Sequence, residues 1–406
     1  MIIKNVLARE ILDSRGNPTI ETDLLLENGL IVSSSVPSGA STGENEALEL
    51  RDNDKNRYHG KGVLKAVNNV NTIIKNALVG KEVNQEVIDN LLIELDGTNT
   101  KSKLGANAIL SVSLCVMKAL AKMNNQELYQ YLGNDYTLPY PMMNVINGGV
   151  HASSGLEIQE FMIVPTQDSF KERLRCGSEV FHTLKDHLKK DGYSTAVGDE
   201  GGFAPQLNSI ENALDYIIVA IKESNYLPGK DVFLALDCAA SEFYDGDKYT
   251  INHKKITKTE LIDYYLMLVD KYPIISIEDA FAENDIASIK TLTSKIGDKI
   301  MLVGDDYFVT NINYLEKGIK EKYNNAILLK ANQIGTVTEM LKTIDHAKKN
   351  NIKTIISHRS GETEDTFIAD MAVGLNLGYI KTGSICRGER IGKYNQLLRI
   401  EEKIRK

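Results

Sequence analysis

Apolar and polar positions alternate along the first part of the chain in a way that predicts antiparallel strands. Residues 2–33 follow this pattern, with a break at Asn28-Gly29, and an Asn-Gly pair is typical of a tight hairpin turn. From Val63 to Gly80 the apolar positions recur three or four residues apart, which predicts a helix. We expect further helices over roughly 85–95 and from Gly105 onward, the latter apolar on most faces and therefore buried. Strands followed by helices predict a compact α+β unit.

Turn residues then gather in LGNDYTLPYP, residues 132–141. Glycine, asparagine and proline in such a cluster favour a connection between domains. We therefore expect an N-terminal α+β domain over residues 1–134 and a second domain over residues 135–406.

In the second part, six short apolar runs each end in a charged or ionisable residue. The end residues are Asp237, Glu278, Asp305, Lys330, His358 and Lys381. Between 23 and 41 residues separate consecutive ends, which leaves room for a helix in each interval, and TKTELIDYYLMLVDKY is a clear helical pattern in the first. Two earlier runs, PMMNVIN and EIQEFMIVP, bring the strands to the eight that close a (β/α)8 barrel.

The strand ends of such a barrel meet at one rim, so the six end residues are expected to converge. Any one of them alone is an ordinary solvated strand end. Together, Asp237, Glu278 and Asp305 would place three carboxylates side by side, and these repel one another unless a cation lies among them. An all-oxygen donor set favours Mg²⁺ or Mn²⁺ over zinc, with a purely structural ion as the alternative.

The strands that come after these three in the sequence end in basic residues. Lys330, His358, Arg359 and Lys381 are suited to binding a small anionic substrate against the metal. A lysine next to a divalent cation and a second ammonium group is expected to have a lowered pKa. Lys330 is therefore a candidate general base.

Two loops carry further candidates. VGDEGG contains Asp199 and Glu200 between glycines, and Glu160 lies on an early barrel strand; for each acid alone, exposure on a surface loop is the ordinary interpretation. Residues 35–52, SVPSGASTGENEALELRD, form a small-residue loop that leads to an expected helix start. The segment lacks the P-loop pattern and is either a connector or a mobile lid over a phosphate or an ion.

Composition narrows the class of protein. The chain of 406 residues has 42% hydrophobic and 25% charged residues and a formal charge of -8, which is typical of a globular protein and offers no basic face for nucleic acid. Four scattered cysteines without a CxxC pair indicate reduced thiols. With no signal-peptide core and no long uncharged apolar stretch, we expect a cytoplasmic protein without a membrane span.

The motifs DSRGNPT, PSGASTGE, KSKLGANAIL, QEFMIVP, VGDEGG, LDCAASEFY, LLKANQIG, SHRSGETED and IKTGS stand in one order along the chain. In these stretches the chain resembles the enolase family. The resemblance implies a β2α2(βα)6 barrel with a smaller capping domain and a mobile loop at residues 35–46. It also implies a glycolytic and gluconeogenic lyase that reversibly dehydrates 2-phospho-D-glycerate to phosphoenolpyruvate through a metal-stabilised ene-diolate.

The same resemblance assigns roles to individual residues. Two Mg²⁺ ions are implied, one permanent and held by Asp237, Glu278 and Asp305, the other bound with substrate and held by Ser41 and the phosphate. Lys330 matches the general base and Glu200 the general acid, with Glu160 hydrogen-bonding nearby and Lys381 neutralising the substrate carboxylate. The remaining matches are to substrate contacts or site-lining residues: His151, Gln159, His358, Arg359 and Ser360.

Two alternatives stay open. One is an acid-sugar dehydratase of the same superfamily, which shares the three carboxylates but commonly lacks the SGAST and SHRSGE motifs. The other is a protein displayed on the cell surface whose C-terminal KIRK binds a plasminogen-like host protein; a frayed basic tail is the simpler interpretation of KIRK. Family likeness further implies a homodimer, or an octamer built from dimers.

Overall fold

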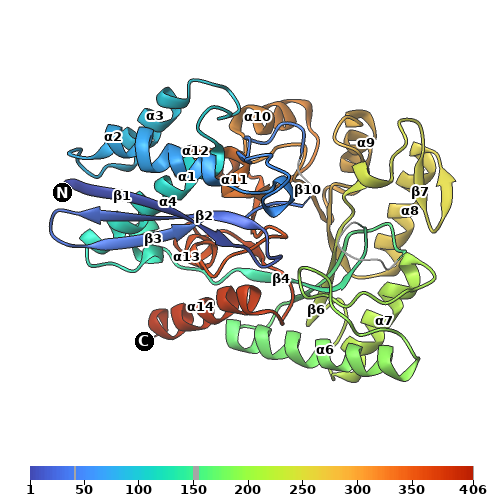
Figure 1. Ribbon diagram of the computed structural model, residues 1–406. Coiled ribbons are helices and arrows are strands. Elements are labelled where there is room, and N and C mark those ends of the chain that lie inside the picture. The colour runs from blue at the N-terminus through green and yellow to red at the C-terminus, as the bar shows by residue number, and fades with distance from the viewer. Residues whose placement is uncertain (41–42, 150–154, 406) are drawn as a thin grey trace.

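The N-terminal part of the chain contains a three-stranded antiparallel sheet. The structure, a computed structural model, describes residues 1–40, 43–149 and 155–405 (Figure 1). The strands β1 (Ile3–Leu12), β2 (Pro18–Leu26) and β3 (Ile31–Ser35) lie in sequence order. The predicted turn at Asn28-Gly29 is confirmed: Gly29 has a φ of 88° and its N–H donates to the carbonyl of Leu26. A residue with a side chain rarely adopts that left-handed backbone, which explains the glycine.

Helices cover one face of this sheet (Figure 1). The helix predicted up to Gly80 is one helical run made of α1 (Leu64–Asn69), a π-helical turn (Val70–Ile74) and α2 (Lys75–Leu78). The next predicted helix is α3 (Gln85–Asp96), which begins where Asn84 accepts a hydrogen bond from the N–H of Val87 and ends at the left-handed Gly97. Both ends follow the usual capping chemistry of helices. The short α5 (Leu128–Leu132) closes this part.

The helix expected from Gly105 is α4 (Ala106–Met123), and it forms the core of the N-terminal part. By length and composition alone α4 could cross a membrane, but 78% of it is buried within the protein. It packs against the sheet, where the hydroxyls of Ser111 and Thr22 lie 2.7 Å apart and the Cys115 thiol donates to the carbonyl of Thr22. A buried helix of this kind needs apolar residues on nearly every face.

Eight strands then close into a barrel, as the sequence predicts. They are β4 (Tyr140–Asn147), β5 (Glu160–Pro165), β6 (Val232–Asp237), β9 (Ile274–Glu278), β10 (Met301–Gly304), β11 (Ala326–Leu329), β12 (Lys353–Ser357) and β13 (Tyr379–Lys381). All neighbouring pairs are parallel except those of β5, which runs antiparallel to both β4 and β6. Glu160 therefore begins its strand at the rim where the other strands end, opposite Asp237. This ββαα(βα)6 order is the one that the family resemblance implied.

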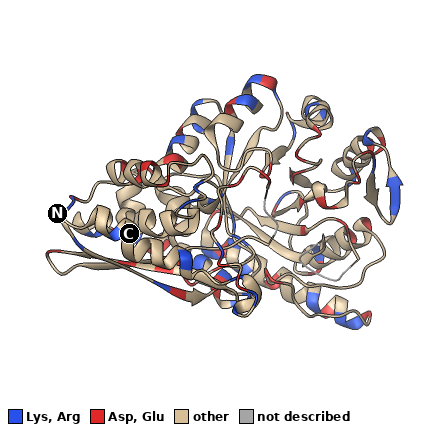
Figure 2. Cartoon of the chain, turned by 45° about the horizontal axis from the view of Figure 1, so that its top comes forward, with Lys and Arg blue, Asp and Glu red and all other residues tan. Residues whose placement is uncertain are grey.

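Helices surround the barrel and run mostly along its outside (Figure 1). They are α6 (Phe170–Lys190), α7 (Ile210–Glu223), α8 (Lys258–Lys271), α9 (Ile286–Ile296), α10 (Ile312–Glu321), α11 (Ala331–Ile334), α12 (Val337–Lys349), α13 (Phe367–Gly374) and α14 (Gly388–Ile404). α8 is the helix predicted between the first two charged strand ends, and Thr257 with Glu260 forms a capping box at its start. Figure 2 shows acidic and basic residues interspersed along these outer helices.

Some local features differ from the expectations. The helix start expected by residue 52 is wrong, and residues 47–54 are irregular. In a helix the N–H of Asp52 would donate to the carbonyl of Leu48, but here it donates to Gly62, and the Leu48 carbonyl accepts from Ala106. A hairpin of β7 (Tyr249–Ile251) and β8 (Lys254–Ile256) lies between β6 and α8, in a segment for which the sequence pattern made no prediction.

The expected frayed tail is also wrong up to residue 405. α14 continues to Ile404, where Lys403 forms an ion pair with Glu127 at 2.6 Å and Arg405 one with Glu401 at 3.0 Å. Opposite charges at these positions favour a helical end over a free one.

Candidate active site

The predicted site residues meet at the rim formed by the strand ends. They line a small cavity of about 30 Å³ that includes Gln159, Glu160, Glu200, Asp237, Asp305, Lys330, His358, Arg359, Ser360 and Lys381. Glu278 lies beside them through its contact with Lys381. Two predicted residues, Ser41 and His151, lie outside the described residues. A cavity of this size admits very few water molecules, so a phosphorylated acid enters only if neighbouring groups move.

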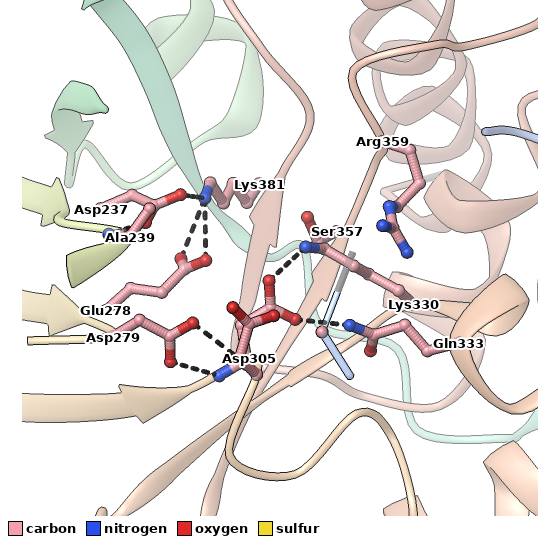
Figure 3. Close-up of polar contacts among 12 residues, drawn as sticks. Asp237, Ala239, Glu278, Asp279, Asp305, Lys330, Gln333, Ser357, Arg359 and Lys381 are labelled. Atoms are coloured by element: carbon pink, nitrogen blue, oxygen red, sulfur yellow. Dashed lines mark hydrogen bonds and ion pairs between the residues drawn. The ribbon is translucent and has the colours of Figure 1, made fainter. Parts of the chain in front are cut away.

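The ammonium group of Lys381 is the centre of the acidic side. Its Nζ lies 2.6 Å from Asp237 and 3.0 Å from both oxygens of Glu278 (Figure 3). It also lies 3.1 Å from Glu160. All four side chains are buried. Burial opposes the charge of Lys381, but the surrounding carboxylates outweigh it and raise its pKa well above the usual value. Three carboxylates around one ammonium still leave an excess of negative charge, and a buried excess of charge is costly.

Glu160 carries part of that excess. Its pKa lies well above the usual value, mainly because it is buried and secondly because Glu200 repels its charge. The pKa of Glu278 is raised in the same way, by burial and by repulsion from Asp237. The second oxygen of Glu160 and the side-chain oxygen of Gln159 have no hydrogen-bond partner among the described residues. Gln159 donates through Nε2 to Asp237 at 3.3 Å. Buried oxygen atoms without donors are suited to receive a cation or a substrate hydroxyl.

Asp305 faces a second cation, Lys330. Lys330 follows β11 and its Nζ forms an ion pair with one oxygen of Asp305 (Figure 3). The other oxygen accepts a hydrogen bond of 2.7 Å from Gln333. Gln333 is oriented in turn by the hydroxyl of Thr310, which donates to Oε1 and accepts from the backbone N–H of Lys330. Lys330, Asp305, Gln333 and Thr310 thus form one connected network.

The chain's own groups raise the pKa of Lys330, whereas a lowered pKa is expected from the sequence. Burial lowers it, but the attraction of Asp305 and Glu278 prevails, so that the net shift is upward. The pKa of Asp305 is correspondingly lowered, because Lys330 and Arg359 outweigh its burial. The expected lowering rested on a divalent cation and on a second ammonium group beside the amine. Lys381 does lower the pKa of Lys330, but the nearby carboxylates act in the opposite direction and prevail.

Further acids support this side of the rim. Asp279 accepts hydrogen bonds from the backbone N–H groups of Asp305 and Asp306 at 2.9 and 3.0 Å, which fixes the turn after β10.

The backbone near the rim is left-handed at Asp279, with a φ of 42°, and at the consecutive Val309 and Thr310, with φ of 41° and 56°. Left-handed geometry at a β-branched residue is strained, and such strain is characteristic of functional sites.

Acidic groups at the rim are compatible with a metal site. Ligand atoms lie within 4.8 Å of one another in two groups among the described residues, Glu160 with Glu200 and His358, and Asp279 with Asp305 and Asp306. The predicted trio is divided between the two lysines: Asp237 and Glu278 contact Lys381, and Asp305 contacts Lys330. All three stand at neighbouring strand ends, because β6, β9 and β10 are adjacent in the barrel.

Glu200 and His358 face each other on the opposite side. Glu200 is buried, whereas its neighbour Asp199 is exposed, so that of the two loop acids only Glu200 enters the site. His358 Nε2 lies 3.5 Å from Oε1 of Glu200, and the side-chain amide of Asn144 donates to Oε2 at 3.2 Å. Burial is the main reason why the pKa of His358 lies well below its usual value.

The loop after β3 contacts the cationic side. Arg359 forms a two-pronged ion pair with Glu46, and the hydroxyl of Ser360 accepts from the N–H of Ala40 at 2.8 Å. Ser38 and Gly361 exchange two backbone hydrogen bonds. The described part of the loop is thus docked on the barrel in this structure.

Several residues of the network were not predicted from the sequence: Glu46, Asn144, Thr310, Gln333 and Arg390. Asn144 could have been noticed as a polar residue within the apolar run of β4, and Gln333 lies three residues after Lys330. Glu46 and Arg390 reach the site from distant segments, and no local pattern in the sequence distinguishes them.

Comparison with protein families agrees with the fold. The family model for the enolase N-terminal domain matches residues 3–132. The model for the enolase C-terminal TIM barrel domain matches residues 135–406. Together the two matches span almost the whole length of the sequence. The chain therefore belongs to the enolase family and is an enzyme of the enolase superfamily.

Proposed function

We propose that this enzyme catalyses the Mg²⁺-dependent, reversible dehydration of 2-phospho-D-glycerate to phosphoenolpyruvate and water. The observation that carries the proposal is the buried Lys330 amine, placed between a set of carboxylates on one side and Arg359 on the other (Figure 3). Removing a proton next to a carboxylate requires a base and positive charge to receive the electrons. The rim supplies both within one network.

The donor set fits a hard divalent cation. Asp237, Glu278 and Asp305 would hold the first ion, and Ser41 together with the substrate phosphate would hold the second. Three carboxylates, the excess negative charge around Lys381 and the unpartnered oxygen of Glu160 support this assignment. When bound, Mg²⁺ supplies positive charge that stabilises the developing charge on the substrate carboxylate.

The chain's own residues bind the substrate and move the protons. Arg359 and Ser360 would bind the phosphate, with Gln159 and His151 as further substrate contacts and His358 lining the site, and Lys381 would neutralise the carboxylate. In the forward direction Lys330 Nζ takes the proton from C2, and that electron pair moves into the carboxylate. The bond between C3 and the hydroxyl oxygen then breaks, and the hydroxyl takes a proton from Glu200 and leaves as water. Glu160 orients the hydroxyl through its buried carboxyl group.

The proposal includes the setting of the reaction. An enzyme with this activity belongs to glycolysis and gluconeogenesis in the cytoplasm, as a homodimer or an octamer of dimers. Secondary display on the cell surface with binding of a plasminogen-like host protein through KIRK receives less support, because Lys403 is already paired with Glu127.

One assay tests the proposal. Mixing the enzyme with 2-phosphoglycerate and Mg²⁺ is expected to raise the ultraviolet absorbance as the enol phosphate forms, and a chelator is expected to abolish the rise. An acid-sugar dehydratase would instead act on a sugar acid without a phosphate. Failure to convert 2-phosphoglycerate in the presence of Mg²⁺ would exclude the proposed activity.

A further inference from the structure

Arg390 connects the C-terminal helix α14 to three consecutive residues of the site. Its guanidinium is fully buried. Nη1 lies 2.6 Å from Nδ1 of His358 and donates to the carbonyl of Arg359 at 2.6 Å, and Nη2 donates to the carbonyl of Ser360 at 2.7 Å. One side chain therefore positions the whole segment that carries the candidate phosphate-binding residues.

The contact with His358 determines which ring nitrogen carries the proton. A guanidinium has only donors and keeps its proton in proteins. Nδ1 of His358 must therefore be an acceptor, which leaves the proton of the neutral ring on Nε2. A doubly protonated ring would bring two donors together at 2.6 Å. Burial opposes a positive ring most, the cations Arg390, Lys381 and Lys330 add to this, and Glu200 favours it.

Nε2 faces the candidate general acid. It lies 3.5 Å from Oε1 of Glu200, while Asn144 donates to Oε2 at 3.2 Å. With the proton on Nε2, an N–H group lies 3.5 Å from Oε1 of Glu200, close to it but not hydrogen-bonded in this structure, and Oε2 accepts from Asn144. Donors favour the ionised form of a carboxyl group, so they assist it in giving up its proton. With the proton on Nδ1, Nε2 would instead present a lone pair that competes with the substrate hydroxyl for the proton of Glu200.

We propose that Arg390 is a positioning residue that fixes His358 as the Nε2–H tautomer and thereby presents an N–H donor to Glu200. The tautomer does not depend on the proposed function. Its effect on proton delivery does, because that effect requires Glu200 to act as the general acid of the dehydration.

The tautomer can be measured without substrate. In protein labelled with ¹⁵N-histidine, two-bond proton–nitrogen correlations distinguish the two neutral tautomers and the charged ring, and the signal of His358 among the seven histidines is identified by its loss in His358→Gln. We expect a neutral Nε2–H ring throughout the range from about pH 5.5 to 8, which brackets the ordinary histidine pKa. A neutral Nδ1–H ring or a charged ring in the wild-type protein would overturn the proposal.

A pair of variants on the same helix separates positioning from stability. Arg390→Met is expected to abolish the single-tautomer signal and to lower turnover of 2-phosphoglycerate at least about tenfold. If the methionine variant does not fold, Arg390→Gln serves in its place, because its amide oxygen can accept a hydrogen bond from a protonated Nδ1.

Lys393→Met is the control: Lys393 is equally buried, but it contacts Glu362 and the carbonyl of Thr363. It is expected to lose stability and keep the Nε2–H signal. An unchanged tautomer in the Arg390 variant, or the same change in both variants, would contradict the positioning role. A wild-type protein that shows the tautomer but does not dehydrate 2-phosphoglycerate would refute the proposed function alone.

Discussion

The guanidinium of Arg359 is paired with the carboxylate of Glu46, with Nη1 to Oε2 at 2.8 Å and Nη2 to Oε1 at 3.1 Å. Both side chains are almost completely buried, with 3% and 7% exposed. Arg359 is the candidate phosphate ligand, so a carboxylate of the loop after β3 occupies the position in which an anionic substrate would bind. Since the cavity that Arg359 lines is small, binding and the opening of this pair are expected to be coupled.

Replacing Glu46 by glutamine is expected to strengthen the binding of inorganic phosphate. The phosphate no longer displaces a charged partner, and hydrogen bonds to charged groups are worth about 1.5–3 kcal/mol, which corresponds to at least about a tenfold change in Kd. Titration calorimetry with phosphate measures the effect, and Glu44→Gln, an exposed acid of the same loop, is the control. Weaker phosphate binding in Glu46→Gln would mean that Glu46 orients Arg359 for the anion.

Lys330 variants test the base. Lys330→Ala is expected to reduce turnover at least about 10²-fold, the lower range for a general base, while Mg²⁺ binding persists because Asp305 remains and loses its competitor. Lys330→Arg retains the positive charge but not a removable proton, so it should fold normally and show the same loss. Exchange of the C2 proton of 2-phosphoglycerate with deuterium, followed by NMR, measures the step directly. Continued exchange in the arginine variant would place the base elsewhere.

Lys381→Met tests the balance of charge at the rim. Without the ammonium, the carboxylates of Asp237, Glu278 and Glu160 lie buried without their shared cation, and breaking such a pair costs about 3–5 kcal/mol. We expect a lower melting temperature, and a larger rise on adding Mg²⁺ than in the wild type, because the metal then supplies the missing charge. Lys101→Met, which removes a buried lysine paired with Glu339, should show only the ordinary rise. An equal rise in Lys381→Met and wild type would contradict a metal site at these acids.

Much of the barrel could be predicted because six of its eight strands carry two signals at once. An apolar run such as FLALD or AILLK shows a buried strand, and its terminal charge marks the rim. The position of Asp237 next to Glu278 then follows from the order of parallel strands. The direction of β5 is different, because reversal of a strand leaves its apolar pattern unchanged; only the resemblance to a family indicated it.

The contacts that cross between distant segments could not be predicted. Glu46 reaches Arg359 over 313 residues of sequence, and Arg390 reaches His358 from another element. The pairing of side chains within the rim was also beyond the sequence, since several acids and several cations allow many combinations. Which acid binds which lysine is decided by the exact positions of the strand ends and by burial.

Asp370 on α13 gives a prediction about pH. Burial is the largest cause that raises its pKa from 3.8 to about 6, and Gln396 offsets this only in part. Because the folded pKa lies above the unfolded one, ionisation costs stability as the pH rises from about 4 to 6, and the shift corresponds to roughly 3 kcal/mol at neutral pH. Asp370→Asn should therefore be more stable than wild type by about 1–3 kcal/mol near pH 7.5 and little different near pH 4.

Asp365 is the control of opposite sign. Despite its burial, Lys118 and neighbouring donors keep its pKa below the usual value, so it contributes stability above its unfolded pKa that is lost as the pH falls through the folded one. Asp365→Asn should destabilise the protein at neutral pH. Urea unfolding at the two pH values measures both variants, and a neutral-pH loss of stability in Asp370→Asn would contradict the sign derived for Asp370.

Thr310 lies at the strained turn after β10 and connects Lys330 with Gln333. Its hydroxyl donates to Gln333 Oε1 at 2.7 Å and accepts from the N–H of Lys330 at 2.8 Å. The donation fixes which end of the Gln333 amide faces Asp305, a candidate metal ligand. Groups that orient metal ligands typically contribute 10–100-fold to metal affinity.

Thr310→Ala is therefore expected to weaken Mg²⁺ binding by about 10–100-fold, whereas Thr310→Ser retains the hydroxyl and should bind nearly as wild type. Titration calorimetry with Mg²⁺ in the absence of substrate measures the affinity separately from turnover. The alanine variant also relieves β-branching at a left-handed position, where φ is 56°, so part of the lost hydrogen-bond energy is recovered and the fold should survive. If the Thr310→Ala and Thr310→Ser variants bind Mg²⁺ equally well, other groups orient the Gln333 amide, and the position of Asp305 does not depend on Thr310.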